Sequence, residues 1–459
     1  MNTNLATQIH EASIEILDNP GVKIEHDGIL RLLKKAGAVI RKNSSVVRLP
    51  EELVKECIEQ APSEVTFADR RSGDQKATSK GKSLIWSVPG MNILRHGKHR
   101  RFLKSDMADI ARLIDQLPEV NGVFGMSMED VHPRVRDIVG LRVMAENTTK
   151  HIRVLSFTPE GADAICEMRS VLGDFPWFSM GFTAHGPLRW TNLALEIFAR
   201  TAKRNIPVTI NGEPMAGVSG PVTLAGSAAV GNAEILAGLV VNQILEPGRP
   251  CIYNFGLAHI FDMRTAIAVT GAPENHLFAD ISAKMGRFYN LPSCSWVSTE
   301  SMCPDSQAAL EKGMGFLSHL QSGVNVIWGV GQLESELTIS PAQALIDNEI
   351  IGYARRLLRG VEVTNETLSV DLIREVGISG EYLSSEHTLV SFSTEFFDPS
   401  ILFRNRRSDW EANGSKTLYE IAEVRADELI NQSHEKVLTD EQVNDLKKIE
   451  QSFVDRILS

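Results

Sequence analysis

Cysteine is scarce in this sequence, and its distribution excludes a disulfide-stabilised protein. The residues are Cys57, Cys166, Cys251, Cys294 and Cys303, an odd number without any CxxC pair. Disulfide frameworks use even sets of cysteines at regular spacing, and they form in oxidising compartments. We therefore expect a cytoplasmic protein without disulfides.

The lysine of a phosphate-binding loop is also missing. The glycine-rich stretch "NGEPMAGVSGPVTLAGS" has Gly212 and Gly217 at the spacing of such a loop, but Val218 stands where the lysine is required. The stretch therefore does not predict a nucleotide site, and its glycines need another explanation.

Signatures of three further enzyme classes are absent. No lysine lies between Lys203 and Lys284 or at the ends of the later predicted strands, which disfavours a Schiff-base aldolase. No HxH, HExxH or Cys/His cluster has zinc-ligand spacing, and the GxSxG elbow of serine hydrolases does not occur. We expect neither a metal ion nor a tightly bound cofactor.

The charge balance disfavours nucleic acid as a partner. The formal net charge is -11, whereas phosphate backbones require clustered basic residues. The one basic run, Arg95–Arg101, predicts a solvated hairpin, with an acidic partner protein as the alternative. No uninterrupted apolar run reaches the ~18 residues of a membrane span, and the amphipathic N-terminus does not resemble a signal peptide.

The pattern of the chain changes near residue 82. Residues 1–81 contain amphipathic segments such as "ATQIHEASIEILDNPGV", which predict an N-terminal helical layer. Across 82–360 short apolar runs alternate with helix patterns in eight units, the runs being SLIWSV, NGVFGMS, IRVLSF, WFSMGFT, PVTINGE, PCIYNFG, SCSWVST and VNVIWGV. Residues 361–459 predict a charged, helical C-terminal extension.

Eight strand–helix units predict an α/β fold with a closed (β/α)8 TIM barrel. Runs that lack polar alternation are typical of strands buried on both faces, as in a parallel sheet. An open doubly wound sheet is the alternative, but it usually has fewer strands.

In such a barrel the site forms where the strands end. Aromatic residues near those ends are Trp86, Phe157, Tyr253, Phe255, Trp296 and Trp328, and carboxylates there include Glu129, Asp130, Glu213, Asp262, Glu300 and Glu334. Each ring alone is typical of barrel filling, whereas several around one mouth would suit a cation. The glycine-rich stretch predicts either a low loop that lets something bulky approach the mouth, or turns and close helix–strand packing.

Several long motifs resemble the trimethylamine methyltransferase (MttB) superfamily. They are "NGEPMAGVSGPVTLAGSAAVGNAEILAGLVVNQILEPGRPCIYNFG", "DMRTA", "PDSQAALEKG", "LLRGVEVTNETL" and "SSEHTLVSFSTEFFDPSILFRNRRSDW", and the opening "IHEASIEILDNPGV" fits as well. The resemblance covers nearly the whole chain. It implies a barrel that transfers a methyl group from a methylamine to the cobalt of a corrinoid (cobalamin) carried by a separate protein.

The resemblance also indicates a branch of this superfamily. Founding members carry pyrrolysine at a place that falls at or beside Ser298, and this chain has none. It is therefore similar to the non-pyrrolysine members, which use quaternary amines such as glycine betaine, carnitine and proline betaine. The chain departs from the family at Glu300 and Met302, where Asp and Lys are frequent, and at Trp328, where His is frequent.

A quaternary amine needs a cation site, and we predict one from the residues near the strand ends. The cage would consist of Phe255, Trp296 and Trp328, with Tyr253 as a further candidate and Glu213 as a counter-charge. A substrate carboxylate would be bound by Arg264 or His387. The alternatives are a structural pair of Arg264 with Asp262, which is equally open, and a structural or surface pair of Glu386 with His387, which the sequence on its own favours. Small residues of the corrinoid-approach loop would be Gly212, Gly217 and Gly220.

Two other functions remain open for this sequence. One is a barrel lyase or hydrolase unrelated to methyl transfer, which the missing lysines and metal clusters disfavour. The other is a non-catalytic relative that binds the amine or the corrinoid protein without turnover, because a fold does not guarantee an activity. In each case we expect a homo-oligomer that binds neither nucleic acid nor membrane.

Overall fold

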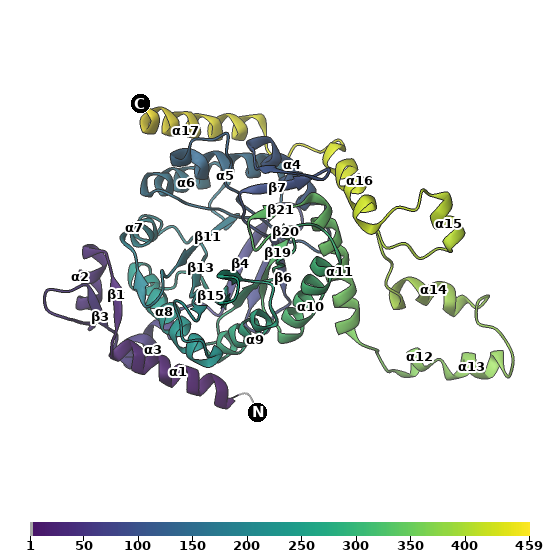
Figure 1. The fold of residues 1–459 in the computed structure, drawn as a ribbon, viewed down its shortest axis with the longest axis horizontal. Helices are drawn as coiled ribbons and strands as arrows, with labels where there is room; N and C mark the ends of the chain where they lie inside the picture. Colours follow the sequence, from purple (N-terminus) through teal and green to yellow (C-terminus); the bar gives the residue numbers. More distant parts are fainter. Residues whose placement is uncertain (1–2) are drawn as a thin grey trace.

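Eight parallel strands close into a barrel at the centre of the molecule (Figure 1). The computed structural model describes residues 3–459. In chain order the strands are β6 (Leu84–Ser87), β9 (Gly122–Phe124), β10 (His151–Arg153), β11 (Phe178–Thr183), β13 (Val208–Asn211), β15 (Cys251–Gly256), β18 (Ser293–Trp296) and β19 (Val326–Val330). Each pairs with its neighbour in the chain, and β19 pairs with β6 to close the ring. The predicted (β/α)8 barrel is confirmed.

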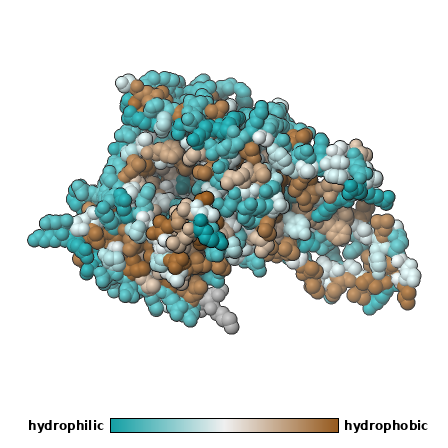
Figure 2. Space-filling view, in the orientation of Figure 1, coloured by the Kyte–Doolittle hydropathy of each residue, from teal (hydrophilic) through white to brown (hydrophobic). Residues whose placement is uncertain are grey.

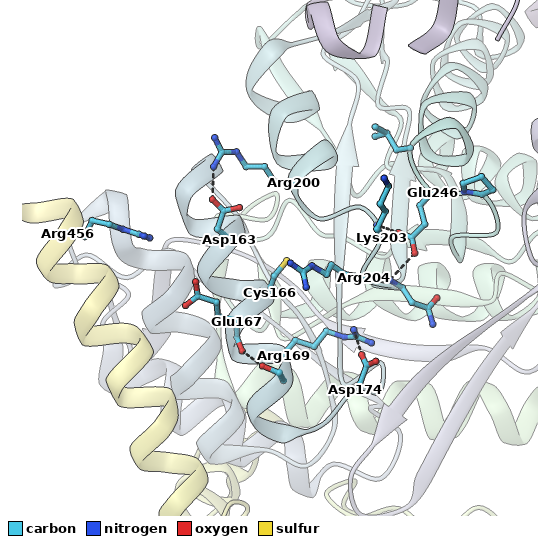
Figure 3. Close-up of a pocket in the computed structure, with 14 residues that line it drawn as sticks. Asp163, Cys166, Glu167, Arg169, Asp174, Arg200, Lys203, Arg204, Glu246 and Arg456 are labelled. Carbon is cyan, nitrogen blue, oxygen red and sulfur yellow. Dashed lines mark hydrogen bonds and ion pairs between the residues drawn. The ribbon is translucent and has the colours of Figure 1, made fainter. Parts of the chain in front are cut away.

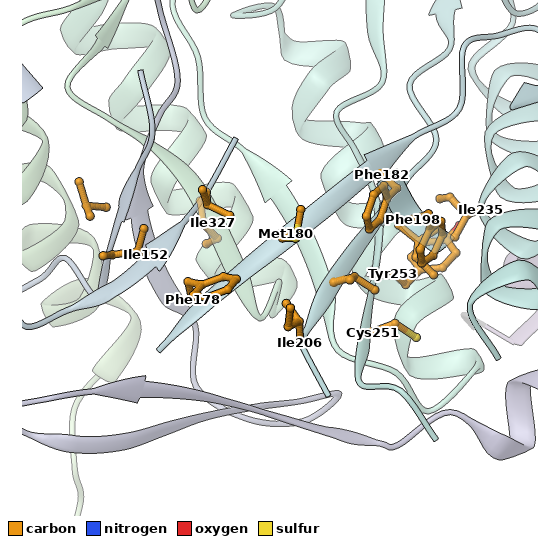
Figure 4. Packing of buried hydrophobic residues seen from close by; sticks show 14 of the residues in the cluster. Ile152, Phe178, Met180, Phe182, Phe198, Ile206, Ile235, Cys251, Tyr253 and Ile327 are labelled. Carbon is orange, nitrogen blue, oxygen red and sulfur yellow. The ribbon is translucent and has the colours of Figure 1, made fainter. Parts of the chain in front are cut away.

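Helices surround the barrel, one after each strand. They are α4 (Lys104–Gln116), α5 (Arg136–Asn147), α6 (Pro159–Leu172), α7 (Asn192–Arg200), α8 (Leu224–Leu245), α9 (Pro273–Phe288), α10 (Ser306–Ser322) and α11 (Pro341–Arg359). Proline stands in the first turn of α6, α9 and α11, where its missing N–H would have no helical partner. Figure 4 shows buried apolar side chains of the core, among them Phe182 beside Phe198 of α7, with 4.0 Å between the ring centroids.

Helix α8 is apolar on all sides. Its length and hydropathy would allow it to span a membrane, but 78% of its apolar window is buried inside the fold. It packs between strands β13 and β15 and two N-terminal helices, α1 (Thr3–Asp18) and α3 (Glu51–Gln60). A helix that is apolar all round is typical of burial within a large core, which is its place here.

The N-terminal segment contains strands as well as the predicted helices. Besides α1, α2 (Asp27–Lys35) and α3, it forms β1 (Val22–Ile24), β2 (Val39–Ile40) and β3 (Val46–Arg48), followed by a hairpin of β4 (Glu64–Asp69) and β5 (Gly73–Thr78). Phe67 of this hairpin packs edge-on against Trp86 and His151, 5.0 and 4.6 Å between ring centroids. The hairpin therefore closes the floor of the barrel, a tertiary role that local helix patterns do not reveal.

The C-terminal extension divides into two parts. Residues 361–399, which we call the arm, leave the barrel wall after α11 and carry α12 (Asn365–Leu368), α13 (Val370–Val376) and α14 (Glu386–Glu395), none of which has a buried residue (Figure 1). A fourth helix without a buried residue, α15 (Arg407–Ala412), follows. The chain then returns, so that α16 (Leu418–Asn431) packs on α4 and α11, and α17 (Asp440–Leu458) packs on α5 and α6.

Two small sheets extend from the carboxyl ends of the barrel strands and surround the mouth. One joins β7 (Asn92–Arg95) and β8 (Lys98–Arg101) to β20 (Gln332–Leu333) and β21 (Thr338–Ile339). The other contains β14 (Met215–Ala216), β16 (His259–Asp262) and β17 (Ile267–Val269). The basic run forms the β7–β8 hairpin, as predicted, and its Arg95 and Arg100 pair with acidic residues of this chain.

An ion pair inside the wall fixes the end of strand β19. Lys312 on α10 and Asp347 on α11 lie 2.8 Å apart, and both side chains are fully buried. Lys312 Nζ also donates to the carbonyl of Gly329, while the Asp347 carboxylate accepts from the N–H of Gly331 at 2.7 Å. These glycines have φ of 134° and 86°, which residues with a side chain rarely adopt. The pair therefore holds a backbone irregularity just where the mouth begins.

Replacing Lys312 tests how much this pair stabilises the fold. Lys312→Met would leave the Asp347 carboxylate buried without its cation, so we expect a loss of about 3–5 kcal/mol in the free energy of unfolding. The midpoint of thermal unfolding measures it. Lys448→Met is the control, because Lys448 forms an exposed ion pair with Asp445. Equal midpoints for both variants would contradict a stabilising role.

Candidate active site

The glycine-rich stretch forms the loop after β13 and packs against the start of α8. A Cβ on Gly212 would collide with the carbonyl of Gly231 on α8, and one on Gly220 would collide with the hydroxyl of Ser227. Gly217 has a φ of 97° and makes a turn. Close packing and turns thus account for these glycines, and the approach of a corrinoid over them stays a prediction.

A cavity of about 670 Å³ opens beside this loop at the mouth. It is lined by Ser156 and Phe157 after β10, by Gly181, Phe182, Thr183, Ala184, His185 and Gly186 in and after β11, by Thr191, Leu193, Ala194 and Ile197, by Glu213, Met215 and Ser219 after β13, and by His259 after β15. Its volume is typical of a small-molecule site, and it lies at the carboxyl ends of the strands. We take this cavity as the candidate active site.

Carboxylates gather at this mouth without basic partners. Glu213 lines the cavity, and burial beside Glu234 raises the pKa of Glu213 to about 7. Burial and then the charge of Glu213 raise the pKa of Glu336, on the loop after β20, well above its usual range. Within residues 3–459 neither Glu213 nor Glu336 forms an ion pair or a hydrogen bond. Unpaired acids in a shared site attract a cation.

Three tryptophans stand at one level of the barrel interior. Trp296 on β18 is opposite Trp328 on β19, which is opposite Trp86 on β6. Trp86 and Trp328 stack with their ring centroids 6.5 Å apart, and Phe124 meets Trp328 edge-on at 5.0 Å. The indole N–H of each tryptophan is buried without a hydrogen-bond partner. Trp296 and Trp328 of the predicted cage therefore lie together in the barrel interior with Trp86 and Phe124, and their binding of a cation stays a prediction.

The aromatic interior already contains a cation from the protein. Arg153, the last residue of β10, is 5% exposed. Its guanidinium carbon lies 5.3 Å from the ring centroid of Phe124 and 5.8 Å from that of Trp328. Burial lowers the pKa of Arg153 to about 9, still above neutral pH, so the group is charged. One face of Trp328 is consequently occupied before any substrate binds.

Tyr253 and Phe255, the other two residues of the predicted cage, point outward to the surrounding helices and not into the barrel. Tyr253 faces outward, where its hydroxyl donates to Asn232 on α8 at 2.9 Å (Figure 4). Phe255 packs edge-on against Phe278 of α9 at 5.4 Å. Since alternate residues of a strand point to opposite faces, Asn254 points inward between them. It donates to Asn211 on the neighbouring strand.

Ser298 and Glu300 lie after β18 and organise the rim. The Ser298 hydroxyl is 2.6 Å from that of Thr270, and Glu300 accepts from the N–H groups of Thr270 and Gly271 at 2.6 and 2.9 Å. Ser335, from the loop after β20, also donates to Glu300. With its oxygens satisfied, Glu300 links three mouth segments as a structural acceptor rather than as a free acid.

The two predicted carboxylate binders lie away from the barrel interior. Arg264, in the turn between β16 and β17, is 90% exposed and pairs with Asp262 at 2.9 Å, the structural alternative considered above. His387 is in the arm, where its Nε2 is 2.9 Å from the hydroxyl of Ser369. The sequence prediction missed Arg153 and Glu336. An arginine in the otherwise apolar run "IRVLSF" was the available signal for the first.

A larger cavity of about 1100 Å³ lies at the opposite end of the barrel, where α6, α7 and α8 end (Figure 3). Charged side chains line it, and several neutralise one another, as Arg200 does with Asp163 at 2.6 Å and Arg169 with Asp174. It is distant from the carboxyl ends of the strands, so we regard it as a solvated groove. Among the described residues no group of three or more His, Cys, Asp or Glu side chains could hold a metal ion.

The sequence matches known proteins over nearly its whole length. A family model for trimethylamine methyltransferase (MTTB) matches residues 1–456. The chain is 32% identical over 423 residues to the trimethylamine methyltransferase MttB of Desulfitobacterium hafniense, covering 89% of this chain and 84% of that one. It is 30% identical over 465 residues to MttB of Methanosarcina thermophila, covering 96% and 94%.

Two further comparisons extend the picture. The chain is 27% identical over 418 residues to a glycine betaine methyltransferase of Desulfitobacterium hafniense, covering 88% and 86%. The crystal structure of the Methanosarcina barkeri monomethylamine methyltransferase MtmB superposes with a TM-score of 0.52 at 13% identity, covering 98% and 92%, which shows a shared fold. On the family model and the relatives at 30% identity or above, the chain belongs to the trimethylamine methyltransferase (MttB) family.

Proposed function

We propose that the protein transfers a methyl group from a quaternary amine, with glycine betaine as the first candidate, to the cobalt of a corrinoid carried by a partner protein. Membership of a methyltransferase family gives the reaction class. One observation carries the choice of a cationic substrate: Glu213 and Glu336 lie at the mouth with raised pKa values and no basic partner. A fixed positive charge on the substrate would satisfy both.

The chemistry of a quaternary amine agrees with the groups at this mouth. The substrate nitrogen is already positive, so the C–N bond breaks with its electron pair staying on nitrogen, and a neutral tertiary amine leaves. The methyl group bonds to the partner's cobalt(I), which supplies the electron pair of the new bond. Glycine betaine would yield dimethylglycine. No proton moves, so the protein needs no general acid, and its contribution is to bind, align and dehydrate the substrate.

The residues have distinct roles in this proposal. Glu213 and Glu336 provide the counter-charge for the ammonium group, and Trp296 and Trp328 form the apolar interior beneath the cavity. Gly212, Gly217 and Gly220 keep the adjacent rim low where the corrinoid approaches. Tyr253 and Phe255 support β15 from outside. The five free thiols suit a reducing compartment such as the cytoplasm.

A methyl-transfer assay tests the reaction directly. The purified protein is mixed with chemically reduced cobalamin, and methylcobalamin is followed by its absorbance. Glycine betaine, carnitine, proline betaine, choline, tetramethylammonium and trimethylamine are offered in parallel. We expect a signal with at least one quaternary amine and none with trimethylamine.

Two results would contradict that expectation. Turnover of trimethylamine alone would move the protein out of the quaternary-amine branch. If no amine yields methylcobalamin, even with the corrinoid protein present, the result would favour a relative that binds its ligand without turnover.

The raised pKa of Glu213 makes binding of a cation depend on pH. This carboxyl is mostly protonated at pH 6 and mostly ionised at pH 8, because burial raises its pKa from 4.5 to about 7. A quaternary ammonium binds the ionised form, so its affinity should rise about tenfold between these pH values. The dissociation constant of tetramethylammonium, measured by calorimetry, checks this.

Glu213→Gln should weaken tetramethylammonium binding and flatten its pH dependence. Glu129→Gln is the control, since Glu129 also follows a barrel strand but is 60% exposed. The raised pKa also means that the folded state holds this proton more tightly than the unfolded chain. The contribution of Glu213 to the free energy of unfolding therefore falls as pH rises from 4.5 to 7. A flat affinity profile in the wild type would exclude Glu213 as the counter-charge.

A further inference from the structure

Arg153 is a buried cation without an anion. Its Nη1 donates to the carbonyl of Val154 at 2.9 Å and its Nη2 to the hydroxyl of Thr209 at 3.2 Å, while Nε has no partner. Between residues 3 and 459 no Asp or Glu forms an ion pair with it. By contrast, the fully buried Lys312 of the wall is compensated by Asp347.

An uncompensated guanidinium in an apolar interior costs several kcal/mol in real proteins. The ring faces of Phe124 and Trp328 offset part of this cost. The rings do not provide a hydrogen-bond acceptor for Nε of Arg153. The indole N–H groups of Trp296 and Trp328 also lack an acceptor. All of these groups donate, and none accepts. A ligand that satisfies them must be an acceptor with negative charge.

The candidate cavity and this guanidinium share one neighbour, Gly181 of β11. Gly181 lines the cavity, and a Cβ on Gly181 would collide with Nη2 of Arg153. Glu213 lines the same cavity from the loop after β13. Positive charge therefore lies behind the cavity wall in the barrel interior, and negative charge lies at the mouth. A molecule that carries a carboxylate and an ammonium group a few bonds apart matches this order of charges.

We propose that Arg153 binds the carboxylate of a betaine-type substrate, which deepens the proposed function and rests on it. The carboxylate points into the barrel, where a planar guanidinium matches it bidentately. The trimethylammonium group then faces Glu213 and Glu336 and presents a methyl group to the open mouth. Arg153 takes the role that the sequence had suggested for Arg264 or His387.

Ligands that differ only in the acidic group test this assignment. Quenching of tryptophan fluorescence gives dissociation constants for glycine betaine and for choline, which has a hydroxymethyl group in place of the carboxylate. We expect the wild type to bind glycine betaine at least tenfold more tightly than choline. Arg153→Gln should bring the ratio to about one and leave the affinity for choline unchanged. A preference that survives in Arg153→Gln, or that the wild type lacks, would overturn the assignment.

Two further variants separate binding from folding. In Gly181→Ala the added methyl group would collide with the guanidinium and displace it, so the variant should lower the same ratio without removing the arginine. Arg249→Gln is the matched control: Arg249 is fully buried with its guanidinium 5.4 Å from the ring of Phe198, and it lies outside the cavity. It should keep the wild-type ratio whatever its melting temperature.

Acetate distinguishes failure of this inference from failure of the proposed function. In one outcome no quaternary amine binds, but acetate quenches the tryptophan fluorescence of the wild type and not that of Arg153→Gln. That result would support the carboxylate site and contradict the quaternary-amine function. If choline and glycine betaine bind equally and acetate does not bind, the function stands and Arg153 has no such role.

A second observation, independent of the mouth, concerns the arm. Its apolar side chains lie in water: Ile378, Leu383, Leu389, Val390, Phe392 and Phe396 are each at least 59% exposed. In Figure 2 brown residues follow the lower edge of this projection. Soluble monomers rarely expose a continuous apolar surface of this extent, which is typical of a protein–protein interface.

The wall of the same chain carries an apolar groove. A cavity of about 350 Å³ lies between α10 and α11, and its lining includes Leu310, Met314, Tyr353 and Leu357, each more than half exposed. No residue of the arm lines it. The arm contacts α11 near its own end, where Arg356 and Arg359 donate to the carbonyls of Glu395 and Thr394. There Phe397 also packs edge-on against Tyr353, with 5.7 Å between the ring centroids.

We infer that the arm of each chain packs into the α10–α11 groove of a second copy. The exchange is reciprocal, so one contact occurs twice about a two-fold axis and the assembly closes as a dimer. A second copy suits the arm better than the corrinoid protein does. The helices of the arm have no hydrophobic core of their own, so their apolar side chains need a permanent interface. A protein that binds only during each methyl transfer cannot provide one.

Light scattering of the full chain during gel filtration measures this. The wild type should elute at about twice its 50.6 kDa. An arm variant, Leu389→Asp with Phe392→Asp, and a groove variant, Leu310→Asp, should each elute as monomers, while Val39→Asp, exposed in the N-terminal segment, should remain dimeric. An equal mixture of the arm and groove variants should recover part of the dimer, because one intact arm then meets one intact groove.

Unfolding of either variant would not produce that recovery, so the mixture separates contact from stability. A monomeric wild type, including one that associates only with the corrinoid protein, would overturn the inference. So would a dimer that survives both the arm and the groove substitutions.

Discussion

A closed barrel of eight strands has a fixed interior volume, and every second side chain must fit inside it. This chain places three tryptophans, a phenylalanine and an arginine there. They fit because neighbouring strands contribute glycine at the same places. A Cβ on Gly122 would strike the ring of Trp86, and one on Gly181 would strike the guanidinium of Arg153. Large side chains and glycines thus compensate one another, and Gly181, which lines the cavity, also adjoins the charged centre.

The two kinds of buried charge in this molecule have different consequences. Lys312 and Asp347 neutralise each other and bind the backbone at the end of β19, so both charges stabilise the local structure. Arg153 and the carboxylates Glu213 and Glu336 have no partners of opposite sign, and burial shifts their pKa values toward the neutral forms. A ligand that carries both charges would relieve both shifts together. Uncompensated charge at a cavity is a general mark of function, whereas compensated charge in a wall is a mark of structure.

The eight strand–helix units were predictable because each apolar run is short and several helices begin with proline in the first turn. The direction of side chains within a run was not. The strand "CIYNFG" is buried on both faces, so no alternation of polar and apolar residues tells Tyr253 and Phe255, which point outward, from Asn254, which points inward. Trp296 in "SCSW" and Trp328 in "VIWGV" lie in the interior, whereas Arg264 and His387 lie on segments whose course depends on tertiary contacts. Glu336 could not be placed because its loop follows the irregularity that Lys312 and Asp347 impose.

The arm lies on a different part of the surface from the mouth, so a dimer interface and an open mouth are compatible. Methyl transfer as proposed requires the mouth to stay open to a corrinoid protein, so a permanent interface must lie elsewhere. The arm and its groove belong to the side wall formed by α10 and α11, whereas the mouth is surrounded by the loops after the strands (Figure 1). The arm and groove are apolar, whereas the mouth is acidic. This difference agrees with the general rule that permanent interfaces are apolar and transient ones are more polar. An arm-exchanged dimer would therefore cover the apolar surface while leaving each acidic mouth accessible to its transient partner.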